Sequence, residues 1–475
     1  MSLKMQHMPL SMIAEFLPDA QLMNMPSSDQ AVKRFISDSR QVVAGDLFIA
    51  LRGEKFDAHD FLNDVQAKGA MACLISSVEK LPQNFPAIVV KDTQEALQLL
   101  SSRWKQYCDQ HKLKQLVIVT GSNGKTTVKG MIQSIFEAAV GVDRALATQG
   151  NFNNEIGLPL TLLRLDLNHE LAVIELGMNH PGETAVLANI AKPSIALINN
   201  AQREHQEFME TVDAVAKEHA LAIEALPQSG VAVYPADSEY SPYWKKIANQ
   251  RSVVDFAFNQ KATVWGEWLD QASGQMVIHT PQGDIQVMLK IMGDHNACNA
   301  VAASAVAIAA GISPAMIQNG LESFQAVSGR MQKHVLADDI TVIDDSYNAN
   351  PDSVRAAIDV LSNIKTAAWL VLGDMGEVGN QGPEFHREVG QYAGEKGVQK
   401  LFALGDLSKE TVVAYQASAS QGNAAQHFAD VGALCTELNK SLQARKNHEG
   451  VTLLVKGSRF MRMERVVKAL AEEMH

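Results

Sequence analysis

Cysteine is scarce in this sequence, and the cysteines that it has are widely spaced. The 475 residues include four cysteines, Cys73, Cys108, Cys298 and Cys435. No two of them form a C-x-x-C pair, so the sequence suggests neither a zinc ribbon nor a disulfide framework. We therefore expect reduced thiols, as in a cytosolic protein.

Long apolar runs are also missing. The longest one, residues 301–312, is rich in alanine, is interrupted by Ser304 and Gly311, and is too short to span a bilayer. The start of the chain, which carries Pro9 and Pro18, lacks the apolar run of a signal peptide. We expect a soluble, cytoplasmic protein that does not insert into a membrane.

Positive charge is in the minority. Lys and Arg number 41 against 53 Asp and Glu, which gives a net charge of −12, and the sequence contains no basic tract. Such a chain is a poor binder of nucleic acid or of an anionic membrane, and an anionic ligand would need a local cationic pocket. The motifs H-E-x-x-H and G-x-S-x-G are absent too, which argues against a zincin protease and an α/β-hydrolase.

What the sequence does contain is an alternation of short apolar runs with helical patterns. The runs are rich in Val, Ile and Leu and do not alternate with polar residues, which is typical of buried parallel strands. Strands that alternate with helices predict an α/β fold. The clearest runs are residues 116–120, 171–176, 195–199, 231–234, 340–344, 368–372, 401–404 and 451–455.

Length and two breaks in this alternation predict three domains. At about 150 residues per domain, the chain makes roughly three. One break follows the strand-like residues 87–90, and the other follows the alanine-rich helix near residue 328. We therefore divide the chain into an N-terminal domain, a central domain and a C-terminal α/β domain, over residues 1–92, 93–327 and 328–475.

A glycine-containing loop connects the first central strand to a helix. It reads T-G-S-N-G-K-T-T and comprises Thr120, Gly121, Ser122, Asn123, Gly124, Lys125, Thr126 and Thr127. Its glycines allow successive N–H groups to point at an anion, and the N-terminal end of the following helix adds a positive dipole. Lys125 would reach the β- and γ-phosphates of a nucleotide, and the Thr126 hydroxyl would bind Mg²⁺.

The loop is not a full Walker A motif. Gly121 precedes Gly124 by three positions, whereas that motif has its first glycine five positions before the second. A glycine turn before a capping threonine is the plainer alternative. The strand, the G-K-T-T sequence and the amphipathic helix stand in one register, which favours nucleotide binding.

Two residues at the predicted carboxyl edge of the sheet are candidate metal ligands. Glu175 ends one apolar run, and His205 follows another. A carboxylate at that edge, beside a phosphate loop, is well placed for Mg²⁺. The alternatives are a helix-capping or surface glutamate and a structural histidine, and spacing alone favours the structural role for His205.

Three further polar segments follow strands or open a helix. G-D-H-N-A-C-N-A contains Asn296 and Asn299, which could bind a base edge, although spacing alone favours a helix cap. D-D-S-Y-N-A-N-P contains Asp345, which could accept a hydrogen bond from a ribose or belong to a solvated turn. K-G-S-R at residues 456–459 could hold an anion or form a basic surface turn.

Taken together, these segments resemble the Mur ligase family of ATP-dependent enzymes that form peptide bonds. The resemblance runs from D-S-R at residues 38–40 to K-G-S-R, and it includes the short glycine spacing of the phosphate loop and G-R at residues 329–330. D-D-S-Y-N-A-N-P and K-G-S-R are similar to the branch that adds D-alanyl-D-alanine to a UDP-N-acetylmuramoyl-tripeptide. A sister branch that adds a single amino acid and a non-catalytic ATP-binding regulator are the alternatives.

The resemblance implies a fold and a mechanism. The implied fold has a central P-loop-type parallel sheet with flanking helices, a C-terminal Rossmann-like α/β domain and a smaller N-terminal α/β domain that binds the UDP group. The tripeptide carboxylate would attack the γ-phosphate of ATP, and the amine of D-alanyl-D-alanine would then attack the acyl phosphate. ATP and Mg²⁺ are the implied cofactors, the reaction belongs to cytoplasmic peptidoglycan precursor synthesis, and we expect a monomer.

The resemblance also implies roles for individual residues. Lys125, Glu175, His205 and Arg330 would be catalytic, and Thr126, Glu175 and His205 would hold the metal. ATP would be bound by residues 121–127 together with Asn296, Asn299, Arg330 and Asp345. The substrates would be bound by Ser39 and Arg40, in the uridine-nucleotide-binding domain, and by Asn151, Asn153, Asn154, Tyr347 and Asn350.

Two positions depart from the family pattern: Ala58, in D-A-H at residues 57–59 where the family commonly has D-G-H, and His219. His219 stands where the family usually has a lysine, often carbamylated so that it acts as a carboxylate toward metal. A neutral imidazole is a weak ligand for Mg²⁺, which prefers oxygen. Lys217 is two residues away and would point to another face of a helix. Either one metal site is altered, or water and substrate oxygens complete it.

Overall fold

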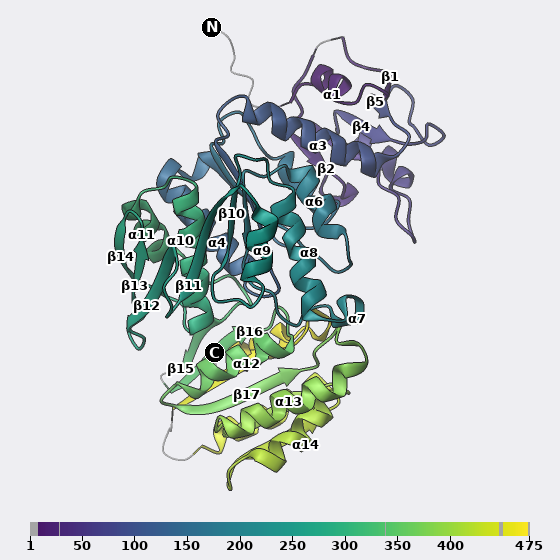
Figure 1. Ribbon diagram of the computed structural model, residues 1–475. Helices are drawn as coiled ribbons and strands as arrows, with labels where there is room; N and C mark the ends of the chain where they lie inside the picture. Colours follow the sequence, from purple (N-terminus) through teal and green to yellow (C-terminus); the bar gives the residue numbers. More distant parts are fainter. Residues whose placement is uncertain (1–7, 28, 338, 446–449, 474–475) are drawn as a thin grey trace.

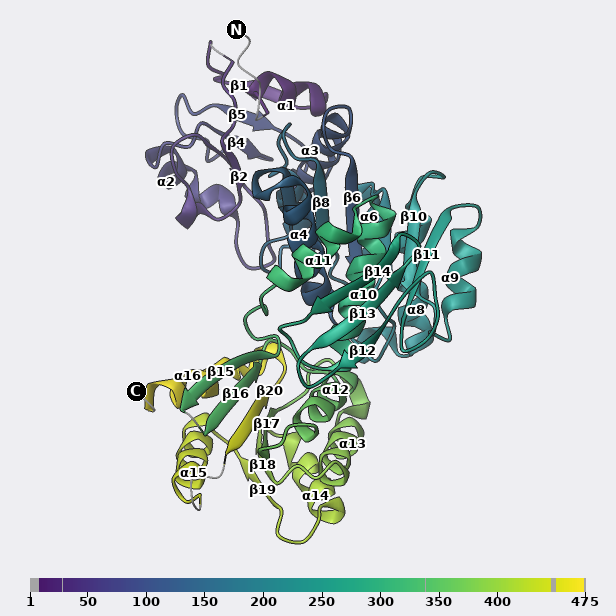
Figure 2. The same cartoon turned by 90° about the vertical axis from the view of Figure 1, so that its left-hand side faces the viewer.

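The chain forms three α/β parts, each built on its own sheet (Figure 1). The computed structural model describes residues 8–27, 29–337, 339–445 and 450–473. Sheets of five, nine and six strands follow one another along the chain, and we call the parts built on them the N-terminal, central and C-terminal domains. The central domain lies between the other two (Figures 1 and 2). This is the α/β architecture that the alternating pattern predicted.

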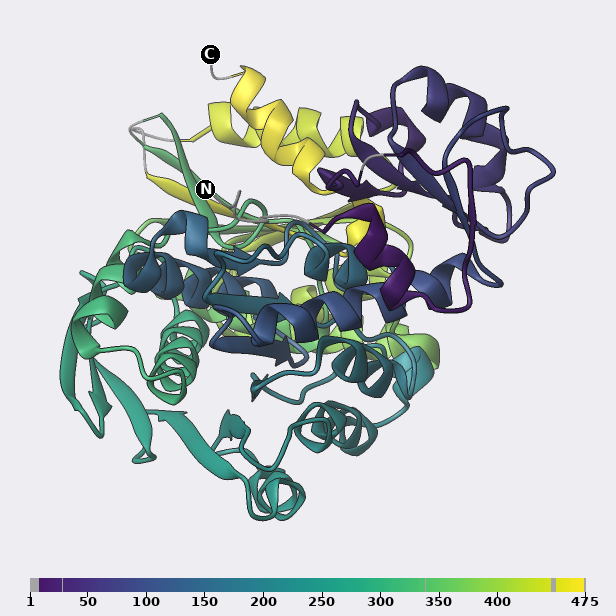
Figure 3. The same ribbon diagram turned by 90° about the horizontal axis from the view of Figure 1, so that it is seen from above.

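The N-terminal domain has a mostly parallel sheet in the order β1-β5-β4-β3-β2, with β1 antiparallel to β5. Viewed from above, this domain (purple) is set to one side of the central domain (Figure 3). All residues of β3 and β4 are buried, as expected for strands that are covered on both faces. The elements are Leu10–Phe16 (α1), Gln21–Met23 (β1), Arg34–Ile36 (β2), Asp46–Ile49 (β3), Leu62–Ala67 (α2), Ala72–Ile75 (β4) and Ala87–Val89 (β5).

The central sheet has the order β14-β13-β12-β11-β10-β9-β6-β8-β7. The strands from β6 to β12 pair in parallel wherever they are neighbours, which confirms the apolar runs predicted as parallel strands. Their bounds are Gln115–Thr120 (β6), Ala145–Ala147 (β7), Leu171–Glu175 (β8), Ile195–Ile198 (β9), Val231–Pro235 (β10) and Ser252–Phe258 (β11). An antiparallel meander that the sequence pattern did not predict completes the edge: Val264–Asp270 (β12), Gln275–Thr280 (β13) and Gly283–Met288 (β14).

Helices cover both faces of the central sheet, and the alternation of side chains along each strand decides which helix a residue meets. In β6, Leu116 and Ile118 pack with one set of helices, and Val117 and Val119 pack with the other. The first set comprises Thr93–Asp109 (α3), Glu183–Ala191 (α6) and Val212–Glu224 (α8). The second set comprises Lys125–Val140 (α4), Asp294–Ala309 (α10) and Pro314–Ser323 (α11).

The C-terminal sheet has the order β15-β16-β20-β17-β18-β19, and β15 alone of these strands runs antiparallel to its neighbour. Helices α12, α13 and α14 cover one face, and α15 and α16 cover the other (Figure 2). The strands are Gln332–Ala337 (β15), Ile340–Asp345 (β16), Ala367–Gly373 (β17), Lys400–Leu404 (β18), Ala424–Phe428 (β19) and Val451–Lys456 (β20). The helices are Pro351–Ser362 (α12), Gly382–Glu395 (α13), Ser408–Ser418 (α14), Val431–Gln443 (α15) and Glu464–Glu473 (α16).

Within the part of the chain that the structure describes, every helix is too short or too polar to cross a membrane. Helix α4 buries Val128, Met131, Ile132, Ile135 and Phe136 completely, which confirms the apolar face that was predicted at helical period. Because α4 begins at the phosphate loop, its packing fixes the position of that loop relative to the sheet.

The close contact between α4 and α11 provides a test of this packing. A Cβ atom on Gly320 of α11 would lie 2.4 Å from the Cα atom of Ile135 in α4. We expect Gly320→Ala to lower the free energy of unfolding, because overpacking costs about 1–3 kcal/mol and a backbone contact is the hardest to relieve. The gain in helix propensity, about 1 kcal/mol, does not compensate.

Urea unfolding followed by circular dichroism measures this effect. Gly432→Ala is the control, since a Cβ atom there would approach one side-chain oxygen of Asp430, at 3.2 Å. A Gly320→Ala protein as stable as the unmodified chain would contradict the proposed helix contact.

Candidate active site

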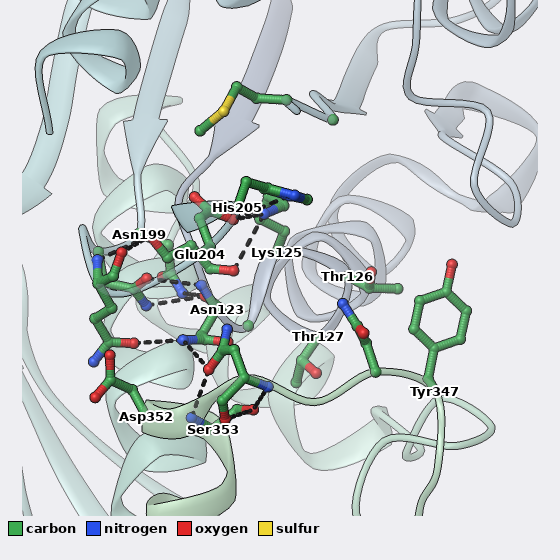
Figure 4. A pocket seen from close by; sticks show the side chains of 18 of the residues that line it. Asn123, Lys125, Thr126, Thr127, Asn199, Glu204, His205, Tyr347, Asp352 and Ser353 are labelled. Carbon is green, nitrogen blue, oxygen red and sulfur yellow. Dashed lines mark hydrogen bonds and ion pairs between the residues drawn. The ribbon is translucent and has the colours of Figure 1, made fainter. Parts of the chain in front are cut away.

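A cavity of about 1490 Å³ opens where the central and C-terminal domains meet (Figure 4). Its lining combines residues that follow β6, β8, β9 and β10 of the central sheet with residues that follow β16 and β20 of the C-terminal sheet. The carboxyl ends of parallel strands are where open α/β sheets bind ligands. The cavity brings together the phosphate loop, Glu175, His205, Arg330 and Asp345, and their roles stay predictions.

The phosphate loop has the backbone that its glycines allow. Gly121 has a φ of +134° and Gly124 a φ of +78°, and both values lie where residues with a side chain are strained. Gly124 is followed directly by α4, so the free N–H groups of the first helical turn face the same cavity. This geometry suits an anion, in agreement with the sequence-based prediction.

The segment that follows β9 holds the loop in shape. The side-chain oxygen of Asn200 accepts a hydrogen bond from the Asn123 backbone N–H at 2.8 Å, and the Asn199 side chain donates to the Asn123 carbonyl at 2.8 Å. The Gln202 backbone N–H donates to the Ser122 hydroxyl at 2.8 Å. Polar contacts from the segment that follows β9 thus hold the loop in its shape before a ligand binds.

Lys125 lies folded over the loop that precedes it. Its ammonium group donates to the carbonyl oxygens of Gly121 and Ser122 and forms an ion pair with Glu204, with an Nζ–Oε2 distance of 3.2 Å (Figure 4). Glu204 is buried. Burial alone would raise its pKa, but the charge of Lys125 and the hydrogen bond from His219 outweigh burial and hold the pKa below its ordinary value. Glu204 is therefore an anion that neutralises Lys125.

His219 sits beneath this ion pair and is completely buried. Its Nε2 atom lies 2.9 Å from Glu204 Oε1, and its Nδ1 atom lies 2.9 Å from the Thr120 hydroxyl. Because both ring nitrogens are occupied, His219 orients Glu204 and offers no lone pair to a metal. Lys217 forms an exposed ion pair with Asp213, on a different face of α8, as predicted. Sequence reasoning missed Glu204, whose only signal is its place directly before His205.

Glu175 and His205 have different surroundings. Glu175 ends β8, is buried, and accepts a hydrogen bond from the Asn153 side chain at 2.9 Å through Oε1, whereas its buried Oε2 atom has no hydrogen-bond partner among the described residues. The His205 Nδ1 atom lies 2.7 Å from Glu377 Oε2 of the C-terminal domain. This close contact with His205 lowers the pKa of Glu377.

These donors fit Mg²⁺ only in part. No three His, Cys, Asp or Glu side chains come together as a metal site within the described ranges. The free oxygen of Glu175 and the hydroxyl of Thr126 are oxygen donors that line the cavity, and Mg²⁺ usually takes one or two carboxylates with phosphate oxygens and water. His205 is instead paired with Glu377, so its predicted role as a metal ligand stays a prediction.

Arg330 reaches the phosphate loop from the start of the C-terminal domain. Its guanidinium donates to the Thr126 hydroxyl at 3.2 Å and stacks over the Tyr347 ring at 4.2 Å. The Nε atom of Arg330 is buried and has no hydrogen-bond partner within the described part of the chain. Arg330 and Lys125 thus bring two cations to the anion site of a chain that is negative overall.

The predicted nucleoside-binding residues line the cavity and already take part in internal hydrogen bonds. Asn296 donates to the Met292 carbonyl at 2.8 Å, and Asn299 accepts from Asn199 at 2.9 Å. Asp345 accepts from the ammonium group of Lys456 at 2.5 Å. These contacts anchor the side chains, and their predicted roles toward adenosine stay predictions.

The predicted substrate-binding residues divide into two groups. The first group lines the cavity: Asn151, Asn153, Asn154, Tyr347 and Asn350. The second group, Ser39 and Arg40, lies in a turn of the N-terminal domain outside the cavity lining. Within that turn, Arg40 is highly exposed and pairs with Asp38. The structure therefore does not bring these two residues to the rest of the site.

Comparisons with known proteins agree with the geometry. Residues 34–105 match the description "Mur ligase family, catalytic domain", residues 119–307 match "Mur ligase middle domain", and residues 329–459 match "Mur ligase, glutamate ligase domain". The UDP-N-acetylmuramoyl-tripeptide--D-alanyl-D-alanine ligase of Escherichia coli (strain K12) is 37% identical, over 94% of this chain and 96% of that protein. The enzyme of that name from Bacillus subtilis (strain 168) is 32% identical, over 94% and 95%.

Solved structures show the same three-domain fold. A crystal structure of MurF from Acinetobacter baumannii superimposes with a TM-score of 0.88 at 30% identity and covers 98% of this chain and all of that one. MurF ligase from Thermotoga maritima, crystallised in complex with ADP, has a TM-score of 0.77 at 24% identity and covers 93% of this chain and 98% of that one.

The crowding around Gly124 predicts a specific sensitivity of the phosphate loop. A Cβ atom on Gly124 would lie 2.6 Å from the Asn299 side-chain oxygen and 2.9 Å from the Asn199 side-chain nitrogen. Because the loop or the two amides would have to shift, we expect Gly124→Ala to weaken Mg·ATP binding roughly tenfold or more. Each factor of ten corresponds to about 1.4 kcal/mol of binding free energy. Isothermal titration calorimetry measures the affinity.

Gly141, at the other end of α4, provides the control. Its φ of +91° makes alanine strained there as well, but a Cβ atom would meet nothing within 4 Å. Gly141→Ala should therefore retain the affinity of the unmodified chain. Equal losses in the two variants would show that backbone strain, and not crowding of the two amides, is responsible.

Proposed function

This chain belongs to the Mur ligase family, and on that premise we propose that it joins D-alanyl-D-alanine to a UDP-N-acetylmuramoyl-tripeptide at the expense of ATP. The observation that carries the proposal is the cavity between the central and C-terminal domains, which is lined by the phosphate loop, Arg330 and Glu175. Relatives aligned over 94% of the chain bear the name of this activity. They favour it over a sister ligase that adds one amino acid and over a non-catalytic regulator.

The proposed reaction has two steps. A carboxylate oxygen of the tripeptide attacks the γ-phosphorus of ATP, the bond between the β–γ bridging oxygen and that phosphorus breaks, and ADP leaves. The amine of D-alanyl-D-alanine then attacks the carbonyl carbon of the acyl phosphate. Inorganic phosphate leaves, the amine loses a proton, and an amide remains. Neither step needs a side-chain nucleophile, so catalysis consists of positioning and of stabilising charge.

The residues of the cavity suit these requirements. The N–H groups of the phosphate loop and of the first turn of α4 bind phosphate oxygens. Lys125 and Arg330 carry fixed positive charge next to the loop, where charge builds up on the transferred group. Phosphates would displace Glu204 as the partner of Lys125. Closure of the two domains over the bound substrates would exclude water and so protect an acyl phosphate from hydrolysis.

Mg²⁺ belongs to the same proposal. Glu175 and Thr126 would hold it, and when bound it would neutralise phosphate charge. We further propose that the enzyme works in the cytoplasm, where ATP and UDP-linked precursors are available. We also propose that the enzyme acts as a monomer.

Coupled turnover tests the proposed function. We expect ADP to form only when Mg·ATP, the UDP-linked tripeptide and an amine acceptor are all present, and D-alanyl-D-alanine to be used in preference to D-alanine. A coupled spectrophotometric assay of ADP release, with product identified by mass spectrometry, measures both. ADP release that is independent of both co-substrates would indicate a nucleotide switch, and a preference for a single amino acid would indicate the sister activity.

Removal of the Lys125 charge provides a second test. Lys125→Ala should lower kcat roughly 10²-fold or more, as does the loss of one preorganised charge donor in other enzymes. Lys217→Ala is the control, because it removes the same charge from the exposed face of α8. Steady-state kinetics with saturating substrates distinguishes the two variants, and near-normal turnover by Lys125→Ala would contradict the role of the loop.

A further inference from the structure

Four consecutive residues after β9 point alternately to two different parts of the molecule. Gln202 and Glu204 bond to the phosphate loop, at Ser122 and Lys125. Arg203 and His205 pair with acidic side chains of the C-terminal domain. Residues 202–205 therefore form a link between the loop and the C-terminal domain, and we call this segment the interdomain link.

Arg203 makes the most extensive contacts of the link. Its guanidinium donates to Asp352 from Nε, at 3.1 Å, and from Nη2, at 2.5 Å, while its backbone N–H donates to the same carboxylate at 2.9 Å. The guanidinium also donates hydrogen bonds to the Glu388 carboxylate, from Nη1 at 2.6 Å and from Nη2 at 3.0 Å. Its Cζ atom lies 5.3 Å from the centre of the Phe385 ring.

These contacts differ from ordinary surface ion pairs. The Arg203 and Asp352 side chains are each 23% exposed. Arg203 binds the carboxylates of Asp352 and Glu388 each in bidentate geometry, which is the strong form of an ion pair. The hydrogen bonds to Glu388 and Asp352 raise the pKa of Arg203, and Arg203 in turn lowers the pKa of Glu388. One arginine thus joins the first turn of α12 and the middle of α13 to the central domain.

A second contact, close to the first, ties the same helix directly to the loop. The Asn350 side chain caps α12 and exchanges hydrogen bonds with the Asn123 side chain, at 2.9 and 3.4 Å. Residues near the start of α12 therefore meet both the loop and the link. A shift of α12 relative to the link would separate Asn350 from Asn123.

We propose that Arg203 is a positioning residue that holds the C-terminal domain against the phosphate loop, so that Arg330 reaches the phosphates. The expected effect on kcat rests on the proposed function. The expected contact between the two domains rests on geometry alone. Arg203 lies next to two residues that support the loop, so the domain contact and the loop are mechanically coupled. Arg203 itself touches neither nucleotide nor peptide in this role.

Three variants and a matched control test the proposal. Arg203→Gln removes the charge, Glu388→Gln removes one of its partners, and Arg203→Lys keeps the charge without the planar fork. The control is Arg355→Gln: Arg355 pairs with the same Glu388 at 2.9 Å, but both residues belong to the C-terminal domain. The control thus loses an ion pair of the same kind that does not cross the domain boundary.

Small-angle X-ray scattering of the full chain without nucleotide gives the structural readout. Arg203→Gln and Glu388→Gln should have a larger radius of gyration than the unmodified chain, whereas Arg355→Gln should superimpose on it. The far-ultraviolet circular dichroism spectrum should be unchanged in all of them. Superimposable scattering of Arg203→Gln and the unmodified chain would overturn the proposal, whatever the protein catalyses.

Kinetics gives the functional readout. We expect Arg203→Gln to lower kcat roughly tenfold to a hundredfold, the size of effect that misplacing a reacting group produces. Arg203→Lys should recover part of the loss, and Arg355→Gln should retain kcat. Unchanged kcat for Arg203→Gln in an active unmodified enzyme would overturn the positioning role. An inactive unmodified enzyme would instead contradict the proposed function and leave the scattering result to decide the domain contact.

Discussion

The rest of the site depends on the hydrogen bonds between the phosphate loop and the residues that follow β9. Asn199 and Asn200 fix the backbone of the loop, and Gln202 fixes the Ser122 side chain, before any ligand arrives. Each such bond contributes only about 1 kcal/mol net, but together they remove conformational freedom that binding would otherwise have to remove. The glycines make the loop geometry possible, and the neighbouring strand makes it stable.

The electrostatics of the site follow from the same arrangement. In a chain with a net charge of −12, an anion site needs a concentrated set of cations, and Lys125 and Arg330 supply them from two different domains. Glu204 balances Lys125 in the absence of ligand, and His219 and Thr120 hold Glu204 in place. An unpaired charge buried at this position would be costly, so the ion pair lets the loop fold without its ligand.

Local sequence patterns predicted eight of the buried strands, helix α4 and the loop, because periodicity and glycine spacing are local properties. Which side chains pair with one another in the folded chain is not a local property. Thr120 and His219 are 99 residues apart, and Arg203 and Glu388 are 185 residues apart, so only the packed domains reveal these pairs. The meander over β12–β14 also escaped prediction, since its half-exposed strands lack the continuous apolar runs that marked the others.

The same distinction explains where the predicted site was incomplete. Asn350 was expected to bind substrate, and the structure shows it capping α12 and bonding to Asn123. Ser39 and Arg40 lie outside the cavity, whose described lining begins at Gln94, in α3 of the central domain. Motifs thus pointed to residues that line one cavity, while only the tertiary structure revealed the contacts that support them.

Transfer of an oxygen atom from the peptide to phosphate tests the central claim most directly. With both oxygens of the accepting tripeptide carboxylate carrying a heavy isotope, the proposed acyl phosphate predicts that each phosphate released during turnover contains one labelled oxygen. Mass spectrometry of the phosphate measures the label. Phosphate that carries no label, released together with the amide product, would contradict the transfer of the γ-phosphoryl group to the carboxylate.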